Sequence, residues 1–205
     1  EPMRETITAS LSLPHDFEPT GEDAGKRELA NCLLAYGVHA DSDAAEAALV
    51  EKFRKAENMT DREFAFRLIL QEMQGSAEAE EAMNEFYERY RDDPIVLDKW
   101  FTAQAVVSGR SAVATCRRLV AHDAFKWTNP NRVRSVIGAF SSGNPTGFNR
   151  ADGTGYRFII EAIGKLDAIN PQVAARLLTA FRSWRMLEPE RRNKAQDALR
   201  SLKKG

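Results

Sequence analysis

The sequence has few residues that bind metals or form disulfides: two cysteines and three histidines among 205 residues. His15, His39 and His122 lack a Glu-x-x-His or Cys-x-x-Cys context, so no local metal site is expected and the chain is predicted to hold no cofactor. Cys32 and Cys116 are too few and too far apart for a disulfide framework. Both fall on apolar helix faces, and we expect both to be small core residues.

Long apolar runs are also absent. No stretch approaches the roughly 20 apolar residues that a membrane-spanning helix needs. The opening residues Glu1 to Ser12 lack the basic and then apolar layout of a secretion signal. The sequence therefore predicts a cytoplasmic protein that has no membrane partner.

The alternating pattern of β-strands is nearly absent, and apolar residues recur instead at helical spacing. Such stripes include Leu29, Cys32, Leu33 and Tyr36, then Phe66, Ile69, Leu70 and Met73, and later Val133, Val136, Ile137 and Phe140. The spacing predicts helices over 22–36, 43–55, 60–74, 76–91, 94–107, 110–122, 130–140, 154–168, 171–185 and 189–203. Short links between such helices favour antiparallel neighbours, as in a bundle or an α-solenoid of stacked helix pairs.

Helix starts are marked by a capping side chain followed by proline, which needs no amide donor at the first helical position. This pattern occurs at Asp93-Pro94, Asn129-Pro130, Asn144-Pro145 and Asn170-Pro171. Thr60 with Glu63 predicts a capping box. Two segments are expected to be irregular: residues 1–21, which contain Pro14 and Pro19, and the glycine-rich loop 141–154.

Recognisable catalytic motifs are missing as well. No serine or cysteine lies in a nucleophile turn or beside a local base. The glycine-rich loop lacks the lysine and the preceding strand of a phosphate-binding loop, so we interpret it as a tight connection between helices.

Charge is unevenly distributed along the chain, although the net charge is only -1. Residues 1–98 hold 23 acidic and 10 basic side chains, whereas residues 99–205 hold 7 acidic and 19 basic ones. A basic half is compatible with a polyanionic partner, but opposed halves can also attract each other or other domains. We favour the second interpretation.

One polar cluster could bind a ligand. Asn129, Asn131, Arg132 and Arg134 lie at one predicted helix start, and Arg176 and Arg182 lie in a later helix. These side chains could converge on a carboxylate or on peptide carbonyls, for which arginine is well suited. The alternative is a solvated helix face with a few ion pairs.

Several runs of residues, taken together, resemble bacterial aminopeptidase N. The blocks appear in the family's order and near its spacing, and the likeness covers roughly Gly25 to Leu202 well and Glu1 to Pro14 more weakly. They are Glu57-Asn58-Met59-Thr60-Asp61, Asp98-Lys99-Trp100-Phe101-Thr102-Ala103-Gln104-Ala105, Asn129-Pro130-Asn131-Arg132-Val133-Arg134-Ser135-Val136-Ile137-Gly138-Ala139-Phe140, Asn144-Pro145, Asp152-Gly153-Thr154-Gly155-Tyr156 and Asn170-Pro171-Gln172-Val173-Ala174-Ala175-Arg176-Leu177.

The resemblance implies a part of a larger zinc enzyme. Aminopeptidases of this family have four domains, and a His-Glu-x-x-His motif with a later Glu holds zinc in the catalytic one. Neither that motif nor the family's Gly-x-Met-Glu-Asn loop, which binds the substrate's α-amino group, occurs here. The resemblance thus implies a non-catalytic last domain with no cofactor of its own, the zinc being held by the catalytic domain of the parent enzyme.

The fold that the resemblance implies is all-α, a superhelical array of antiparallel helix pairs of the HEAT/ARM-like α-solenoid type. We expect an irregular entry segment over 1–21 and one helical domain over 22–205. This domain would cap the catalytic domain of the same polypeptide and shape the cavity for peptide substrates. Asn129, Asn131, Arg132, Arg134 and Arg176 are the candidates for lining that cavity.

One departure concerns the start of the chain. The family has several more helices between the segment like Leu11 to Pro14 and the one like Ala24 to Arg27, and here only about ten residues join them.

Two other functions remain open. One is a freestanding α-solenoid that binds other proteins. The other is a nucleic-acid binder, but its basic C-terminal cluster lacks an interleaved aromatic platform, so no nucleic-acid partner is expected. That cluster comprises Arg182, Arg185, Arg191, Arg192, Lys194, Arg200, Lys203 and Lys204.

Overall fold

The computed structural model describes Glu18, residues 20–40 and residues 43–202. Every regular element in these ranges is a helix, and they contain no strand, in agreement with the predicted all-α class. The helices divide between Arg89 and Tyr90 into two compact units, here called unit 1 and unit 2. The expected irregular segment 1–21 lies almost entirely outside the described residues, and the helix that follows begins at Gly21.

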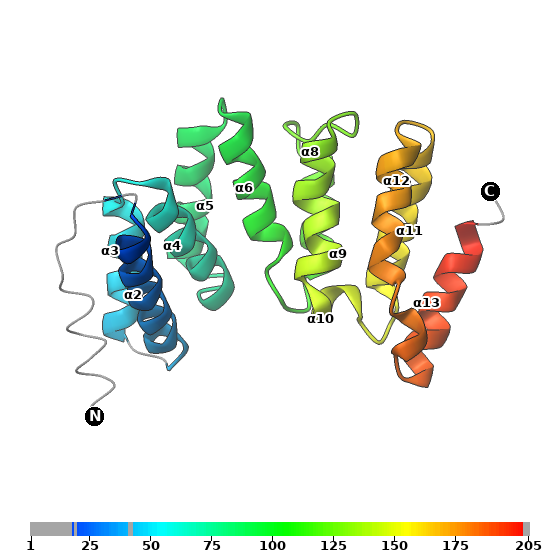
Figure 1. Cartoon of the computed structure of the whole chain (residues 1–205), viewed down its shortest axis with the longest axis horizontal. Helices are drawn as coiled ribbons and strands as arrows, with labels where there is room; N and C mark the ends of the chain where they lie inside the picture. The colour runs from blue at the N-terminus through cyan, green and yellow to red at the C-terminus, as the bar shows by residue number, and fades with distance from the viewer. Residues whose placement is uncertain (1–17, 19, 41–42, 203–205) are drawn as a thin grey trace. The chain divides into compact units, whose positions relative to one another are not determined.

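Unit 1 is built around three phenylalanine rings. Phe66 of α4 stacks on Phe86 of α5 with ring centroids 4.4 Å apart, and Phe53 of α3 lies 6.1 Å from Phe66. All three are buried. The first helix, α2, packs against α3 and α4 (Figure 1). The helices of this unit are α2 (Gly21–His39), α3 (Asp43–Lys55), α4 (Met59–Glu72) and α5 (Ala77–Tyr90).

The buried face of α2 differs from the prediction. Leu29 is 61% and Tyr36 63% exposed, and Cys32 is exposed as well. The buried face carries Leu34 and Val38 together with the polar residues Asp23 and Asn31. The Asp23 carboxylate can be buried because it pairs with Arg27 and accepts a hydrogen bond from the Glu18 amide at 3.1 Å. The predicted core position of Cys32 is therefore wrong, whereas that of Cys116 is confirmed by its complete burial.

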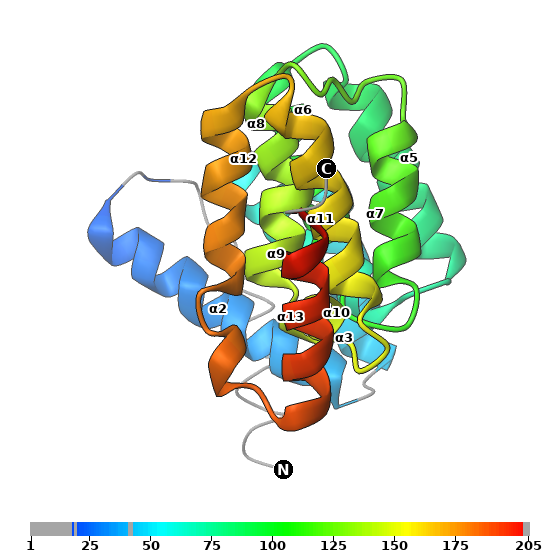
Figure 2. The ribbon, with the colours of Figure 1, turned by 90° about the vertical axis from the view of Figure 1, so that its right-hand side faces the viewer.

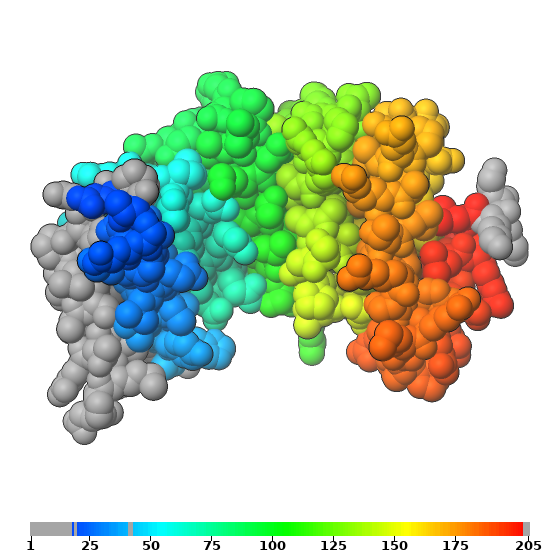
Figure 3. Space-filling view, viewed as in Figure 1, coloured from blue at the N-terminus to red at the C-terminus, as the bar shows by residue number. Residues whose placement is uncertain are grey.

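Unit 2 has two layers of helices. The α6 helix, the helix from α8 through α9, and α12 form one layer, which Figure 3 shows facing the viewer. The α7 and α11 helices pack behind it, and α13 lies against α11 (Figure 2). The elements are α6 (Pro94–Ala105), α7 (Ala112–Ala121), α8 (Pro130–Val133), η1 (Arg134–Gly138), α9 (Ala139–Gly143), α10 (Pro145–Phe148), α11 (Thr154–Asp167), α12 (Pro171–Leu177), η2 (Leu178–Phe181), η3 (Trp184–Met186) and α13 (Pro189–Ser201).

The helix starts predicted from proline are confirmed. The side chains of Asp93, Asn129, Asn144 and Asn170 each accept a hydrogen bond from a backbone amide of the first turn. The Thr60 capping box is wrong, because Asn58 caps α4 by accepting from the Asp61 amide at 2.9 Å.

Two other predicted segments need correction. The segment 141–154 is not a continuous loop, since α9 extends to Gly143 and the short α10 follows. The predicted helix 171–185 is α-helical only to Leu177 and continues as 3₁₀ turns.

Within the described residues, no helix combines the length and the apolar character that a membrane span requires.

Candidate functional site: a cationic groove in unit 2

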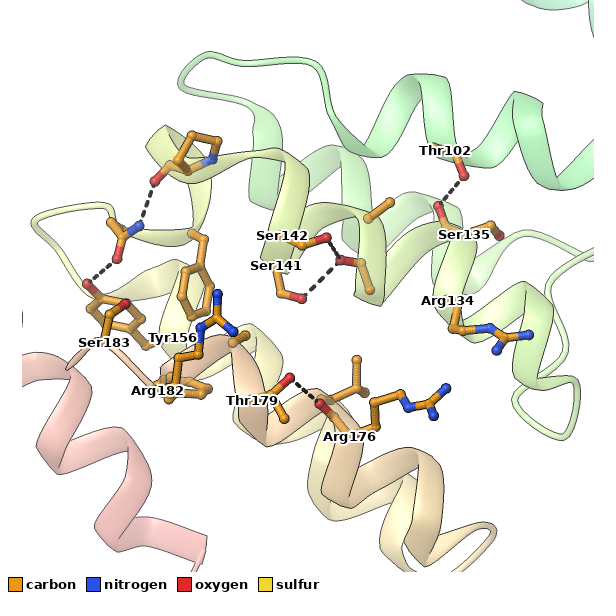
Figure 4. Close-up of a pocket in the computed structure, with 18 of the residues that line it drawn as sticks. Thr102, Arg134, Ser135, Ser141, Ser142, Tyr156, Arg176, Thr179, Arg182 and Ser183 are labelled. Atoms are coloured by element: carbon orange, nitrogen blue, oxygen red, sulfur yellow. Dashed lines mark hydrogen bonds between the residues drawn. The ribbon is translucent and has the colours of Figure 1, made fainter.

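A groove of about 1000 Å³ lies on the first layer of unit 2 (Figure 4). One wall comes from α6 and the helix from α8 through α9, and the other from α12, η2 and η3. Its floor is formed by Phe148, Tyr156 and Phe181. A concave site with an apolar floor and a few polar groups is typical of ligand-binding sites.

The first wall is fixed by a buried ion pair. Arg132 is 5% exposed, and its Nη1 lies 3.1 Å from the Asp98 Oδ1 of α6. Its guanidinium also lies over the ring of Phe101, 4.9 Å from the centroid. This pair joins α8 to α6, and removing one partner would leave an uncompensated buried charge.

A π-helical turn begins directly after this anchor. Residues Arg134–Gly138 form a π-helix, in which the Ala139 amide donates to the Arg134 carbonyl five residues earlier. Carbonyls of this turn are satisfied by hydroxyls: Thr102 Oγ1 donates to the Ser135 carbonyl at 3.1 Å, and Ser141 and Ser142 both donate to the Gly138 carbonyl. Single π turns within α-helices occur frequently at functional sites.

The π turn also carries the first cation of the groove. Arg134 lines the groove and is exposed, and its Nη2 donates to the Asn131 Oδ1 one turn earlier. This hydrogen bond restricts the guanidinium, which otherwise has considerable rotamer freedom.

Two more arginines come from the opposite wall. Asn170 caps α12, and Arg176 lies in the last turn of that helix, where Thr179 Oγ1 donates to its carbonyl at 2.7 Å. Arg182 follows the 3₁₀ turn η2. In Figure 4 the side chains of Arg134 and Arg176 extend in the same direction, whereas Arg182 lies toward the Tyr156 side of the view.

The floor is made of buried aromatic rings that contact one another. The rings of Phe148 and Tyr156 meet edge to face at 5.2 Å, as do those of Phe148 and Phe181. The Tyr156 hydroxyl donates to Asn149 Oδ1 at 2.9 Å. Burial raises the pKa of Tyr156, while the charge of Arg191 acts in the opposite direction. Tyr156 is thus a neutral part of the floor at physiological pH.

The charges that line the groove are mostly positive. They are three arginines and one carboxylate, Asp98, whose charge is compensated by the buried Arg132. The groove therefore offers guanidinium donors to an anionic or carbonyl-rich ligand and has no uncompensated carboxylate of its own.

The structure brings together only part of the predicted site. Asn131, Arg134 and Arg176 line the groove, whereas Asn129 serves as a helix cap and Arg132 lies buried beneath the wall. Arg182 lines the groove too, although it was not among the selected residues. In the sequence, Arg182 stood out only as a member of the arginine cluster with Arg176, and nothing there indicated that it lines the same groove. Whether any of these residues contacts a peptide stays a prediction.

No group of three or more histidine, cysteine, aspartate or glutamate side chains suited to a metal ion exists in the described part of the chain. The groove therefore offers hydrogen bonds and charge rather than metal ligands.

Comparison with known proteins identifies the family. A family model described as a domain of unknown function (DUF3458_C) with ARM repeats matches residues 2–205. The chain belongs to this family. The ARM-repeat description confirms the predicted solenoid class of paired helices, and the two curated relatives described next confirm the resemblance to bacterial aminopeptidase N.

Aminopeptidase N of Escherichia coli (strain K12) is 35% identical over 188 residues, which make up 92% of this chain and 21% of that protein. The enzyme of the same name from Caulobacter vibrioides is 36% identical over 90% of this chain and 21% of its own length. The family domain thus spans about a fifth of these curated relatives and corresponds to one domain of such enzymes.

A solved structure also matches this chain to one part of an aminopeptidase. The crystal structure of Legionella pneumophila aminopeptidase A in complex with aspartic acid matches with a TM-score of 0.88 and 26% sequence identity. The match covers 98% of this chain and 24% of that protein.

Proposed function

We propose that this chain is a non-catalytic domain of a zinc-dependent aminopeptidase, and that it caps the catalytic domain and shapes the cavity through which peptides reach the metal. Sequence similarity to curated aminopeptidases supports the assignment to this class of enzyme. The cofactor would be the zinc ion of the catalytic domain, and the partners would be that domain and the peptide substrates.

The observation that carries the cavity role is the position of two arginines. Arg134 and Arg176 stand in separate sequence blocks that resemble the family, and both line the groove of unit 2. A guanidinium in such a position can donate to carbonyl or carboxylate oxygens of a bound peptide. A freestanding interaction module would need no such link to an enzyme's substrate.

The test compares long and short substrates in the enzyme that contains this chain. We expect Arg134→Ala and Arg176→Ala to lower kcat/KM several-fold or more for peptides of four or more residues. Single-residue chromogenic substrates should be cleaved almost normally, because they do not extend beyond the scissile bond. Each lost charge-assisted hydrogen bond is worth about 1.5 to 3 kcal/mol when desolvated and less when water replaces it.

A matched control is Arg118→Ala on α7, an exposed arginine that does not line the groove. It should affect neither substrate class. Equal losses on long and short substrates would indicate a folding or docking defect, and no change on either would contradict the cavity role.

A further inference from the structure

The three groove arginines have no carboxylate partner among the described residues, a property that they share with exposed arginines such as Arg118 and Arg157. Some other arginines of unit 2 are paired. Arg150 pairs with Asp152 at 2.6 Å and Arg191 with Glu188 at 2.9 Å. By contrast, Arg134 donates to a neutral amide oxygen, and no ion pair of Arg176 or Arg182 occurs in the described ranges. The chain thus places uncompensated positive charge on the groove walls.

Like charges on one groove repel each other unless an anion neutralises them. At physiological salt the screening length is about 8 Å, so this repulsion acts between exposed charges that lie within about that distance of each other. Asp98, the one acidic lining residue, does not offset them because it is held by the buried Arg132. A groove with this charge pattern attracts an anionic group of a ligand.

The chemistry of a peptide limits what that anion can be. Peptide bonds are neutral, and side-chain charges vary with sequence, but every free peptide carries a carboxylate at its C-terminus. A planar guanidinium can bind a carboxylate through two parallel hydrogen bonds. Arg134 and Arg176 both line the groove from opposite walls, and their side chains extend in the same direction in Figure 4.

We infer that the groove of unit 2 binds the C-terminal carboxylate of a peptide, with Arg134 and Arg176 as its direct partners. Arg182 adds positive potential from the Tyr156 side of the groove. This inference rests on the proposed function for its biological setting. A peptide whose amino end is bound at the catalytic centre would have its carboxyl end bound in this groove, if the peptide is long enough to reach it. The domain would then select peptides by length.

The direct test uses the 205-residue chain and three N-acetylated probes, with calorimetry as the readout. The probes are tetra-alanine with a free carboxyl terminus, the same peptide as its C-terminal amide, and an amidated tetrapeptide with one internal glutamate. We expect the free acid to bind at least tenfold more tightly than either amide, because only it presents the carboxylate at the end of the chain.

Variants identify the residues involved. Arg134→Gln and Arg176→Gln together should abolish the preference for the free acid, whereas Arg134→Lys with Arg176→Lys should keep part of it, since lysine retains charge but not the paired hydrogen bonds. Arg118→Gln on α7 is the control and should bind as the unchanged chain does. Circular dichroism of each variant verifies that the helices are intact.

Several results would overturn the inference. They are equal affinity for the acid and its amide, no binding of the acid at millimolar concentration, and an unchanged preference in the Gln variants. Equal binding of the glutamate peptide would overturn the assignment to the chain end. Acetate, titrated in the same way as a fourth probe, should bind more weakly than the free-acid peptide, and equal binding would overturn the role of the peptide. These results leave the cavity role to its own test, which compares long and short substrates in the enzyme.

Discussion

Phe101 links the core of unit 2 to the ion pair beneath the groove. Its ring is fully buried, meets Trp100 edge to face at 5.0 Å, and supports the Arg132 guanidinium. We expect Phe101→Ala to lower the free energy of unfolding by about 3 to 5 kcal/mol, because a ring-sized cavity would remain and Arg132 would lose its aromatic partner. Urea unfolding measures this.

Ile95 provides the comparison for that prediction. It lies on the same helix but is 73% exposed, so Ile95→Ala should change stability by less than about 0.5 kcal/mol. A loss below about 1 kcal/mol for Phe101→Ala would mean that the site collapses around the missing ring.

The two cysteines should differ sharply in reactivity. Burial raises the pKa of Cys116 from 9.0 to about 12, and its side chain is inaccessible, whereas Cys32 is exposed. A thiol reagent should therefore modify one cysteine in the native chain and the second only after unfolding, because the thiolate is the reactive form. Peptide mapping should assign the first to Cys32, and rapid native labelling of both would contradict the burial of Cys116.

The same shift predicts a dependence of stability on pH. The folded state keeps the Cys116 proton more tightly than the unfolded state, so its contribution is complete below pH 9 and is lost as pH rises from 9 toward 12. Cys116→Ala should make the alkaline decline in stability less steep. Thermal unfolding across this pH range measures the difference.

The start of α11 illustrates how closely two elements of unit 2 approach. A Cβ at Gly155 would overlap the carbonyl oxygens of Gly147 and Phe148, so Gly155→Ala must shift backbone and should cost about 1 to 3 kcal/mol or more. Gly164 lies in the same helix with nothing within 4 Å of a Cβ. Gly164→Ala should instead stabilise the chain by about 0.5 to 1 kcal/mol. Equal effects of the two changes would contradict the close approach.

At the level of elements, the sequence predicts most helices because their starts depend on local chemistry. An asparagine or aspartate before proline satisfies the first amides wherever the helix later packs. The π turn over Arg134–Gly138 was not predicted, because it depends on hydroxyls from Thr102, on another helix, and from Ser141 and Ser142. The spacing of the apolar residues in this segment is the same as in an ordinary α-helix.

The face of α2 was mispredicted for a related reason. Leu29, Cys32 and Tyr36 form a more apolar stripe than the face that is buried, which includes Asn31 and Asp23. Apolar spacing cannot reveal that Asp23 is neutralised by Arg27 and can therefore be buried. For the site, the sequence selected Arg134 and Arg176, but only tertiary packing distinguishes them from the buried Arg132 and brings in Arg182.

At the scale of the whole molecule, the division into two units nearly coincides with the division of charge. Residues 1–89 hold 20 acidic and 9 basic side chains, and residues 90–205 hold 10 acidic and 20 basic ones. The cationic groove lies in the unit with excess positive charge, so that unit as a whole favours the approach of a carboxylate. Added salt should weaken the binding of the free-acid peptide, because ions screen this attraction.

The positions of the tryptophan and cysteine side chains allow the separation of the two units to be followed by energy transfer. All three tryptophans, Trp100, Trp127 and Trp184, belong to unit 2, whereas the exposed thiol of Cys32 belongs to unit 1. A maleimide-linked acceptor dye would attach to Cys32 alone in the native chain, since Cys116 is buried. Energy transfer from tryptophan to that dye would then report the separation of the two units in solution, with no residue added or replaced.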